Sequence, residues 1–261
     1  MKHIPRRRFG QNFLIDQAVI RRIVEAIDPL PADKLLEIGP GLGALTGPML
    51  ERVERLQVIE LDRDLAARLQ QAYPPERLVV HQGDALKFDF SVLPAPIRVF
   101  GNLPYNISTP LLFHLAAWAA RFTDLHFMLQ REVVERMVAA PSTPAYGRLS
   151  VMLQYRFRMQ SLFVVPASAF RPEPKVASAI VRMAPLPPRD PEAEDESVFS
   201  QAVTRAFSHR RKTLRNALSG IASEADLLSV GIDPGLRAEN LGVAAFVAIA
   251  NRISRQMAAI R

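Results

Sequence analysis

The feature that most constrains the fold is an alternation of short apolar runs with amphipathic segments along the first 185 residues. Parallel strands must be joined by crossovers of roughly a dozen or more residues, usually helices, so this alternation is typical of a doubly wound parallel sheet. The expected strands cover 34–39, 56–61, 77–82, 97–102 and 125–130. The expected helices between them cover 44–53, 63–72, 109–120 and 131–139. The sequence therefore predicts an α/β fold.

The chain changes character near residue 186. Two further apolar runs, 149–157 and 177–184, are predicted as additional strands with antiparallel partners. The segment PLPPRDPEAEDE (185–196) is rich in proline and charge and is a linker by composition. Only helical patterns follow it, at 197–207, 210–221, 223–229 and 243–258. We therefore expect an α/β domain over 1–185, which begins with an arm of about 16 residues, and an all-helical domain over 186–261.

The composition excludes several classes of protein. No cysteine is present, which rules out disulfides, cysteine metal sites and a cysteine nucleophile, and the five histidines are scattered, so we expect no metal site. The net charge of +7 favours a polyanionic partner, most commonly nucleic acid. No apolar run reaches the ~18–20 residues that a membrane span needs. The first residues have no apolar segment typical of a secretory signal, so we expect a cytoplasmic protein. No heptad pattern indicates a coiled-coil dimer, so we expect a monomer.

A glycine-rich turn follows the first expected strand. In LLEIGPGLGALT (35–46), Gly39, Gly41 and Gly43 let the backbone turn tightly and approach a ligand closely. Glu60 ends the second strand, where its carboxylate can accept two hydrogen bonds from a ribose cis-diol. Asp84 follows the third strand, where it can accept a hydrogen bond from the amine of an adenine. The same spacing fits a loose dinucleotide fingerprint, so these residues alone leave a dinucleotide open.

The fourth expected strand runs into NLPY (102–105) at the same edge of the sheet. The side-chain oxygen of Asn102 and the backbone carbonyl of Leu103 can each accept one hydrogen of a planar amine on a base, which frees the nitrogen lone pair toward an electrophile. Pro104 restricts Leu103 to extended geometry and so aims that carbonyl. Tyr105 can stack on a base held outside its helix. A site that binds an amine beside a loop that binds adenosine favours methyl transfer from S-adenosylmethionine. The methyl group of this donor is already activated by the sulfonium, so the transfer needs no metal.

Seven motifs appear in the order found in a known family: FGQNFL (9–14), EIGPGLGALT (37–46), VIELD (58–62), GDAL (83–86), GNLPYNIS (101–108), QREVVERM (130–137) and FRPEPKVASAIV (170–181). On these motifs the chain resembles the ribosomal RNA adenine N6,N6-dimethyltransferases, and most of all their bacterial small-subunit branch. The resemblance implies a Rossmann-like S-adenosylmethionine-dependent methyltransferase fold with a smaller C-terminal all-helical domain. It also implies dimethylation of N6 on two adjacent adenines near the 3′ end of 16S rRNA, in biogenesis of the small ribosomal subunit.

The resemblance further implies roles for single residues. Those that would bind the cofactor come from the arm and from four strand ends, and they are Asn12, Leu14, Gly39, Gly41, Glu60, Asp84 and Asn102. Within this set Gly39 would contact the amino-acid end, Glu60 the ribose and Asp84 the adenine, and the asparagine of NLPY would also touch the target amine. Phe170, in FRPEPKV, would be a second aromatic against the target adenine, opposite Tyr105.

Basic residues gather at two places along the chain. One is RRRFGQ in the arm, and the other is FSHRRKTLRNAL (207–218), which is predicted as a helix with one basic face. Long cations there would pair with phosphates and make binding depend on salt. The predicted RNA-binding residues are Arg6, Arg7, Arg8, Arg210, Arg211, Lys212 and Arg215.

Three alternatives stay open at the level of sequence. An adenine methyltransferase of the erythromycin-resistance type shares the catalytic motifs but acts on large-subunit rRNA. An RNA-binding assembly factor would keep the RNA contacts without needing the methyl transfer. An NAD-dependent oxidoreductase would use the glycine loop, but it leaves NLPY and the basic tail unexplained.

Overall fold

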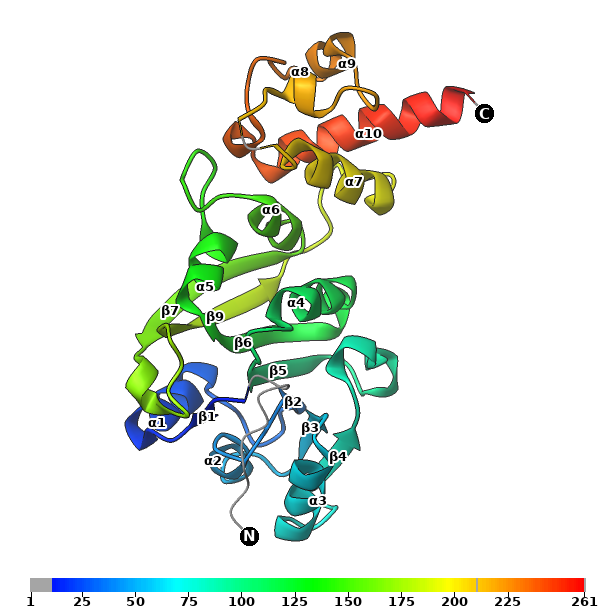
Figure 1. Cartoon of the computed structure of the whole chain (residues 1–261). Coiled ribbons are helices and arrows are strands. Elements are labelled where there is room, and N and C mark those ends of the chain that lie inside the picture. The colour runs from blue at the N-terminus through cyan, green and yellow to red at the C-terminus, as the bar shows by residue number, and fades with distance from the viewer. Residues whose placement is uncertain (1–10, 210, 261) are drawn as a thin grey trace. The chain divides into compact units, whose positions relative to one another are not determined.

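The computed structural model describes residues 11–209 and 211–260, which form two compact units. One unit runs to Val134 and resumes over Phe157–Pro185 (Figure 1). The other consists of Glu135–Arg156 and the chain from Leu186 onward. One division falls at the proline-rich linker. Residues 135–156, predicted as part of the α/β domain, belong to the same unit as the C-terminal helices.

Among the described residues, the first unit contains a seven-stranded sheet with the order β4-β3-β2-β5-β6-β9-β7. Its strands are β2 (Leu35–Ile38), β3 (Leu56–Glu60), β4 (Leu78–Gln82), β5 (Ile97–Asn102), β6 (Phe122–Gln130), β7 (Phe157–Val165) and β9 (Ser178–Pro185). The strands from β4 to β6 are parallel, and β9 pairs antiparallel with both β6 and β7. The predicted α/β class is confirmed, and the five parallel strands lie where the sequence predicts them.

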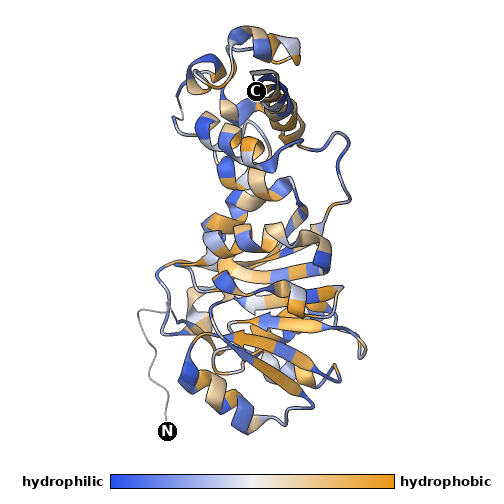
Figure 2. Cartoon of the chain, turned by 90° about the vertical axis from the view of Figure 1, so that its right-hand side faces the viewer, coloured by the Kyte–Doolittle hydropathy of each residue, from blue (hydrophilic) through white to orange (hydrophobic). Residues whose placement is uncertain are grey.

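Helices cover both faces of this sheet, because strand side chains alternate between the faces and both are apolar (Figure 2). On one face, Ile20, Met49 and Leu69 share a buried cluster with Leu35 and Phe100 of the strands. These helical residues belong to α1 (Gln17–Ile27), α2 (Thr46–Leu50) and α3 (Arg63–Ala72). The other face carries α4 (Ser108–Ala117), and α5 (Arg131–Val138) directly follows β6 (Figure 1). Short 3-10 turns, η2 (Ala85–Lys87), η3 (Phe90–Val92), η4 (Ala119–Arg121) and η5 (Ala167–Ala169), lie in the connections.

A second, two-stranded sheet ties the end of the arm to the core. Its strands are β1 (Phe13–Leu14) and β8 (Phe170–Arg171), which pair antiparallel with Leu14 opposite Phe170. The amide of Ile15 also donates to the carbonyl of Ala169 at 2.8 Å. This pairing, which the sequence did not predict, holds Phe13 and Leu14 of the FGQNFL motif beside a segment more than 150 residues later.

The second unit has its own hydrophobic core. Its helices are α6 (Arg148–Gln154), α7 (Glu196–Ala206), α8 (Leu214–Ala217), α9 (Glu224–Ser229) and α10 (Val243–Ile260), with the 3-10 turn η6 (Ala238–Asn240). Phe199 and Phe246 are fully buried at its centre. Asp226 joins α9 to α10, because its carboxylate accepts from Ser223, Gln256 and Arg252. These bonds, led by the Ser223 hydroxyl, lower the pKa of Asp226 to about 2.

The predicted strand over 149–157 is wrong, because most of this stretch forms α6. Leu149, Val151 and Leu153 alternate like residues of a half-buried strand, and a short apolar run does not distinguish the two structures. Tertiary contacts decide in favour of the helix. Val151 packs in the core of the second unit, and the Gln154 amide donates to the carbonyls of Met137 and Ala139 at 3.0 and 2.8 Å. The strand β7 begins only at Phe157.

The predicted basic helix over 207–218 is also wrong, since Leu214–Ala217 is the only helical part of this stretch among the residues that the structure describes. The amides of Leu214 and Arg215 donate to the carbonyls of Leu236 and Pro234, at 2.8 and 3.1 Å. Those donors are therefore not available for the i to i−4 bonds of a continuous helix. Within the described ranges no helix is both long and apolar enough to cross a membrane.

Candidate active site

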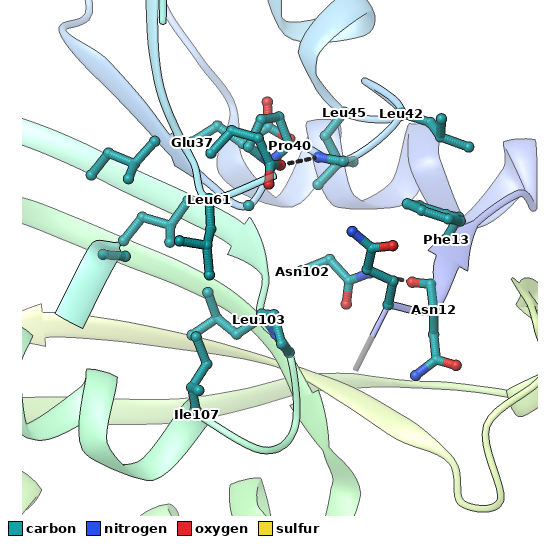
Figure 3. A pocket seen from close by; sticks show the side chains of 18 of the residues that line it. Asn12, Phe13, Glu37, Pro40, Leu42, Leu45, Leu61, Asn102, Leu103 and Ile107 are labelled. Carbon is teal, nitrogen blue, oxygen red and sulfur yellow. Dashed lines mark hydrogen bonds between the residues drawn. The ribbon is translucent and has the colours of Figure 1, made fainter. Parts of the chain in front are cut away.

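A cavity of about 330 Å³ opens at the carboxyl edge of the parallel strands (Figure 3). The predicted cofactor and NLPY residues all line it: Asn12, Leu14, Gly39, Gly41, Glu60, Asp84, Asn102, Leu103, Pro104 and Tyr105. The strand order explains this convergence. After β2 the chain adds β3 and then β4 on one side, and it returns to place β5 on the other side. Ligands of open α/β sheets bind at such a switch point.

The glycine loop takes a backbone shape that other residues rarely adopt. Gly39 and Gly41 have φ values of +69° and +59°, in the left-handed region that favours glycine. The amide of Gly39 donates to the carbonyl of Ile59 at 2.9 Å, which joins the loop to β3. A Cβ on Gly41 would lie 3.2 Å from the ring of Phe13, so the loop and the arm are in close contact.

Glu60 is buried at the end of β3, and only 6% of its surface is exposed. One carboxylate oxygen accepts from the amide of Gly41 at 3.1 Å, and the other accepts from the amide of Asp62 at 2.8 Å. Burial raises the pKa of Glu60, and the two amide hydrogen bonds oppose that rise. Each ionised oxygen can accept a further bond, so the carboxylate suits a pair of ribose hydroxyls.

Asp84 lies at the next strand end and caps η2. Its Oδ1 accepts from the amide of Leu86 at 3.0 Å, so the turn orients the carboxyl group. Apolar side chains also line the cavity: Leu61 and Leu42 are both partly exposed, and Leu42 lies near Phe13 (Figure 3). An acceptor beside apolar side chains fits a planar adenine with an exocyclic amine.

Glu37 also lines the cavity, although it was not among the predicted site residues. The side chain is buried within β2, where Oε2 accepts from the hydroxyl of Thr46 at 2.6 Å. The pKa of Glu37 is raised to about 8, chiefly by burial; the Thr46 hydrogen bond opposes this rise and the nearby carboxyl of Glu60 adds to it. A carboxyl inside the apolar strand LLEI was the sequence signal that could have revealed this residue.

Asn102 has a defined amide orientation. Its Nδ2 donates to the backbone carbonyl of Asn12 at 3.0 Å (Figure 3). Because only the nitrogen can donate, this bond distinguishes the two ends of the amide. Leu103 is held through its own amide, which donates to the carbonyl of Met128 at 3.2 Å. In the described part of the chain no protein group donates to the Asn102 Oδ1 or to the Leu103 carbonyl, so neither acceptor is engaged in a protein hydrogen bond.

Gly101 precedes this pair and permits the close approach of two strands. A Cβ at Gly101 would lie 2.3 Å from the carbonyl oxygen of Ile38, a distance that real Cβ atoms do not show. The absence of a side chain therefore lets the end of β5 lie against β2 and brings Asn102 beside the glycine loop. Gly101 was not among the predicted site residues, because the sequence does not reveal its neighbour across the sheet.

Tyr105 is half-buried at the cavity and is held at both ends. Its hydroxyl lies 2.6 Å from the Oγ of Ser178, and its carbonyl accepts from the hydroxyl of Ser108 at 3.1 Å. Burial raises the pKa of Tyr105, against the opposing effect of the Ser178 bond. Ser178 belongs to the FRPEPKVASAIV motif, but its contact with Tyr105 could not be read from that motif.

The structure does not bring every predicted residue to this cavity. Phe170 is 3% exposed, packs in the core beside Leu14 and does not line the cavity, so its contact with a target base stays a prediction. Arg211 and Lys212 are exposed in the second unit, and Arg215 pairs with Glu224 at 3.0 Å. The predicted residues Arg6, Arg7, Arg8 and Arg210 lie outside the described residues.

Comparison with known proteins identifies the family. A sequence model described as ribosomal RNA adenine dimethylase matches residues 2–255. The chain belongs to the ribosomal RNA adenine dimethylase family. It is 62% identical to the ribosomal RNA small subunit methyltransferase A of Aromatoleum aromaticum, over 97% of this chain and 96% of that protein. It is 60% identical to the protein of the same name from Chromobacterium violaceum, over 97% of each chain.

Two solved structures share the fold of this family member. A dimethyladenosine transferase from Plasmodium falciparum superposes with a TM-score of 0.79 at 23% identity, over 94% of this chain and 98% of that one. The 23S rRNA methyltransferase ErmE superposes with a TM-score of 0.71 at 24% identity, over 93% of this chain and 100% of that one. The predicted methyltransferase fold is therefore confirmed. The predicted activity, an rRNA adenine dimethyltransferase that uses S-adenosylmethionine, is confirmed by the family.

Proposed function

We propose that this protein dimethylates N6 of two adjacent adenines near the 3′ end of 16S rRNA during biogenesis of the small ribosomal subunit. The names of the relatives at 62% and 60% identity support the small-subunit substrate. The observation that carries the chemistry is the amide orientation of Asn102. Its Nδ2 is bound to Asn12, so its oxygen and the Leu103 carbonyl remain as two acceptors at the cavity.

Two fixed acceptors act on a planar amine in a defined way. The aromatic amine of adenine is a poor nucleophile because its lone pair is delocalised into the ring. The Asn102 oxygen and the Leu103 carbonyl would each accept one amine hydrogen, which favours a pyramidal nitrogen with its lone pair directed at the methyl group. Both acceptors are held by hydrogen bonds to other segments, so little reorganisation is needed during the reaction. Tyr105 would stack on the base and hold it outside its helix.

The residues of the cavity also fit the methyl donor. S-adenosylmethionine supplies a methyl group already activated by its sulfonium leaving group. Glu60 would accept from the ribose hydroxyls, and Asp84 would accept from the adenine amine. Gly39 and Gly41 would bring backbone close to the amino-acid end, while Asn12 and Leu14 of the arm cover the site. The fit rests on the chemistry of this donor and acceptor set and on the apolar wall beside it.

The RNA contacts are the second part of the proposal. Arg211, Lys212 and Arg215 would pair with phosphates, together with Arg210 and the basic residues Arg6 to Arg8 of the arm. We place the protein in the cytoplasm, where the small subunit assembles, and expect it to act as a monomer. The fold is common to small-subunit and large-subunit enzymes, because the 23S rRNA methyltransferase ErmE has the same fold. The small-subunit relatives do favour this proposal.

The test uses S-adenosylmethionine labelled in its methyl group. The protein is incubated with small subunits that lack this modification, with large subunits and with free rRNA, and the labelled nucleosides are then identified. Dimethyladenosine from small subunits alone is the expected result. Label in large subunits would replace the proposal with the erythromycin-resistance alternative. RNA binding without any label, in a protein that still binds the donor, would favour the assembly-factor alternative.

A further inference from the structure

The hydrogen bond between Tyr105 and Ser178 joins the NLPY segment to a distant strand. The two oxygens are 2.6 Å apart and belong to residues 73 positions apart in the chain. Ser178 is fully buried, whereas Tyr105 is half-buried and lines the cavity. The bond therefore runs from the wall of the cavity into the protein interior.

Ser178 is a rigid anchor because of its place in the sheet. It is the first residue of β9, where it pairs with Gln130 of β6 on one side and with Val165 of β7 on the other. A strand residue with partners on both sides has little backbone freedom. Its short side chain adds one torsion, so the Oγ position is nearly set by the sheet.

Tyr105 is consequently held at two points. Ser108 binds its carbonyl at 3.1 Å, and Ser178 binds its hydroxyl at the far end of the ring. A tyrosine at the wall of a cavity could otherwise adopt several side-chain rotamers. Bonds at both ends restrict the ring to one of them. A base stacks on the face of the ring, whereas the hydrogen bond is made at its edge. The bond therefore orients the ring and leaves its face free to stack.

We propose that Ser178 is a positioning residue for methyl transfer, whose hydroxyl holds the Tyr105 ring in the orientation that receives the target base. This inference rests on the proposed function, since only a base substrate would need the ring face. The benefit is preorganisation: a ring already in place costs no side-chain ordering when the base arrives. The Tyr105 hydroxyl serves as an anchor and is not required as an acid or base.

The experiment is a double-mutant cycle on the full chain. Ser178→Ala and Tyr105→Phe each remove the same hydrogen bond from opposite sides, and the double variant removes both partners. We expect each single variant to lower the single-turnover rate on unmodified small subunits, at saturating S-adenosylmethionine, by roughly 3- to 10-fold. We expect the double variant to be no slower than the slower single variant, because the same bond is lost only once.

A matched control separates positioning from loss of stability. Ser150 is also a fully buried serine whose hydroxyl donates to a backbone carbonyl, that of Arg136 at 2.5 Å, but it lies in the second unit. Ser150→Ala is expected to lower the midpoint of thermal unfolding without changing the single-turnover rate. Ser178→Cys keeps a donor at the same position but makes a weaker hydrogen bond, and it provides a second variant should Ser178→Ala fold poorly.

Two results would overturn the inference. The first is a double variant whose fold-loss in single-turnover rate equals the product of the two single losses. The second is a Ser178→Ala enzyme that is as fast as the wild type. A readout in the absence of RNA separates these results from failure of the proposed function. The NMR signal of Tyr105 in protein labelled with ¹³C at the tyrosine Cζ, assigned by its loss in Tyr105→Phe, is expected to shift and broaden in Ser178→Ala. If the wild type transfers no label to any RNA but this shift occurs, the substrate is wrong and the anchoring stands; an unchanged signal refutes the anchoring itself.

Discussion

Replacement of Gly101 with alanine should impair the active site by displacing Asn102, although every side chain predicted to bind a ligand keeps its chemical identity. The new Cβ would lie 2.3 Å from the carbonyl oxygen of Ile38 and 3.2 Å from its carbonyl carbon. Close carbon–oxygen contacts in proteins lie at about 3.3 Å, so the two strands would have to separate by about 1 Å at this point. Both β2 and β5 are interior strands with neighbours on each side, so neither can move freely.

The magnitude follows from that displacement. Overpacking of a well-packed interior costs about 1–3 kcal/mol of unfolding free energy, and a clash with backbone should fall near the upper end. Asn102 is the next residue, so its acceptor oxygen would move with the strand. A misplacement of about 1 Å can lower the rate of a positioned reaction by about 100-fold. We therefore expect a folded variant that is destabilised by about 3 kcal/mol and about 100-fold slower.

The assay combines equilibrium urea unfolding with single-turnover methylation of unmodified small subunits. Gly242→Ala is the matched control, because a Cβ there meets nothing within 4 Å and no positive φ is involved. It should stay within about 0.5 kcal/mol of the wild type. A Gly101→Ala variant with wild-type stability and rate would show that the close approach of β5 to β2 does not position Asn102.

Three further outcomes follow from single side chains. Asn102→Ala should lower the methylation rate by about 100- to 1,000-fold through loss of one preorganised acceptor, with little change in RNA binding measured by filter retention; equal losses in rate and RNA binding would contradict the assigned role. The pKa of Glu37 is raised from 4.5 to about 8 on folding, so the native state holds a proton that the unfolded state releases, and stability should fall as pH rises across that window. Urea unfolding at pH 5 and pH 8 should show this loss of stability in the wild type and not in Glu37→Gln. An equal loss in both proteins would refute the role of Glu37. The pKa of Asp226 is lowered from 3.8 to about 2, so its stabilisation is present above pH 3.8 and lost toward pH 2. Asp226→Asn should lower the thermal midpoint at pH 7 and match the wild type near pH 2, whereas a constant difference would argue against the charge.

The errors of sequence reasoning have a common physical origin. At 149–157, the alternation of apolar residues fits either a strand or a helix, and contacts from α5 and the helical core select the helix. At 207–218, the residues favour a helix locally, but the loop at 234–236 takes the backbone donors. In both places a partner from elsewhere in the chain outweighs the local pattern. Such a partner leaves no periodic signal in the segment that it reshapes.

The sequence by itself determined the parallel α/β class and the residue types at the strand ends. Apolar strands alternate with helices at a spacing that permits only crossover connections, and the carboxyl ends of parallel strands share one edge. Glu60, Asp84 and Asn102 could therefore be placed together from the order of the strands alone. Their chemistry, with the glycine loop, was sufficient to indicate an adenosine ligand and an amine acceptor.

Only the tertiary structure decided how these side chains are oriented. The Asn12 carbonyl sets the amide of Asn102, the Ser178 hydroxyl holds the ring of Tyr105, and the missing side chain of Gly101 lets the strands meet. Each of these contacts joins segments between 63 and 90 residues apart, so no local pattern encodes it. Periodicity reports which face a residue occupies, whereas hydrogen-bond direction depends on the exact placement of a partner that folding brings from elsewhere in the chain.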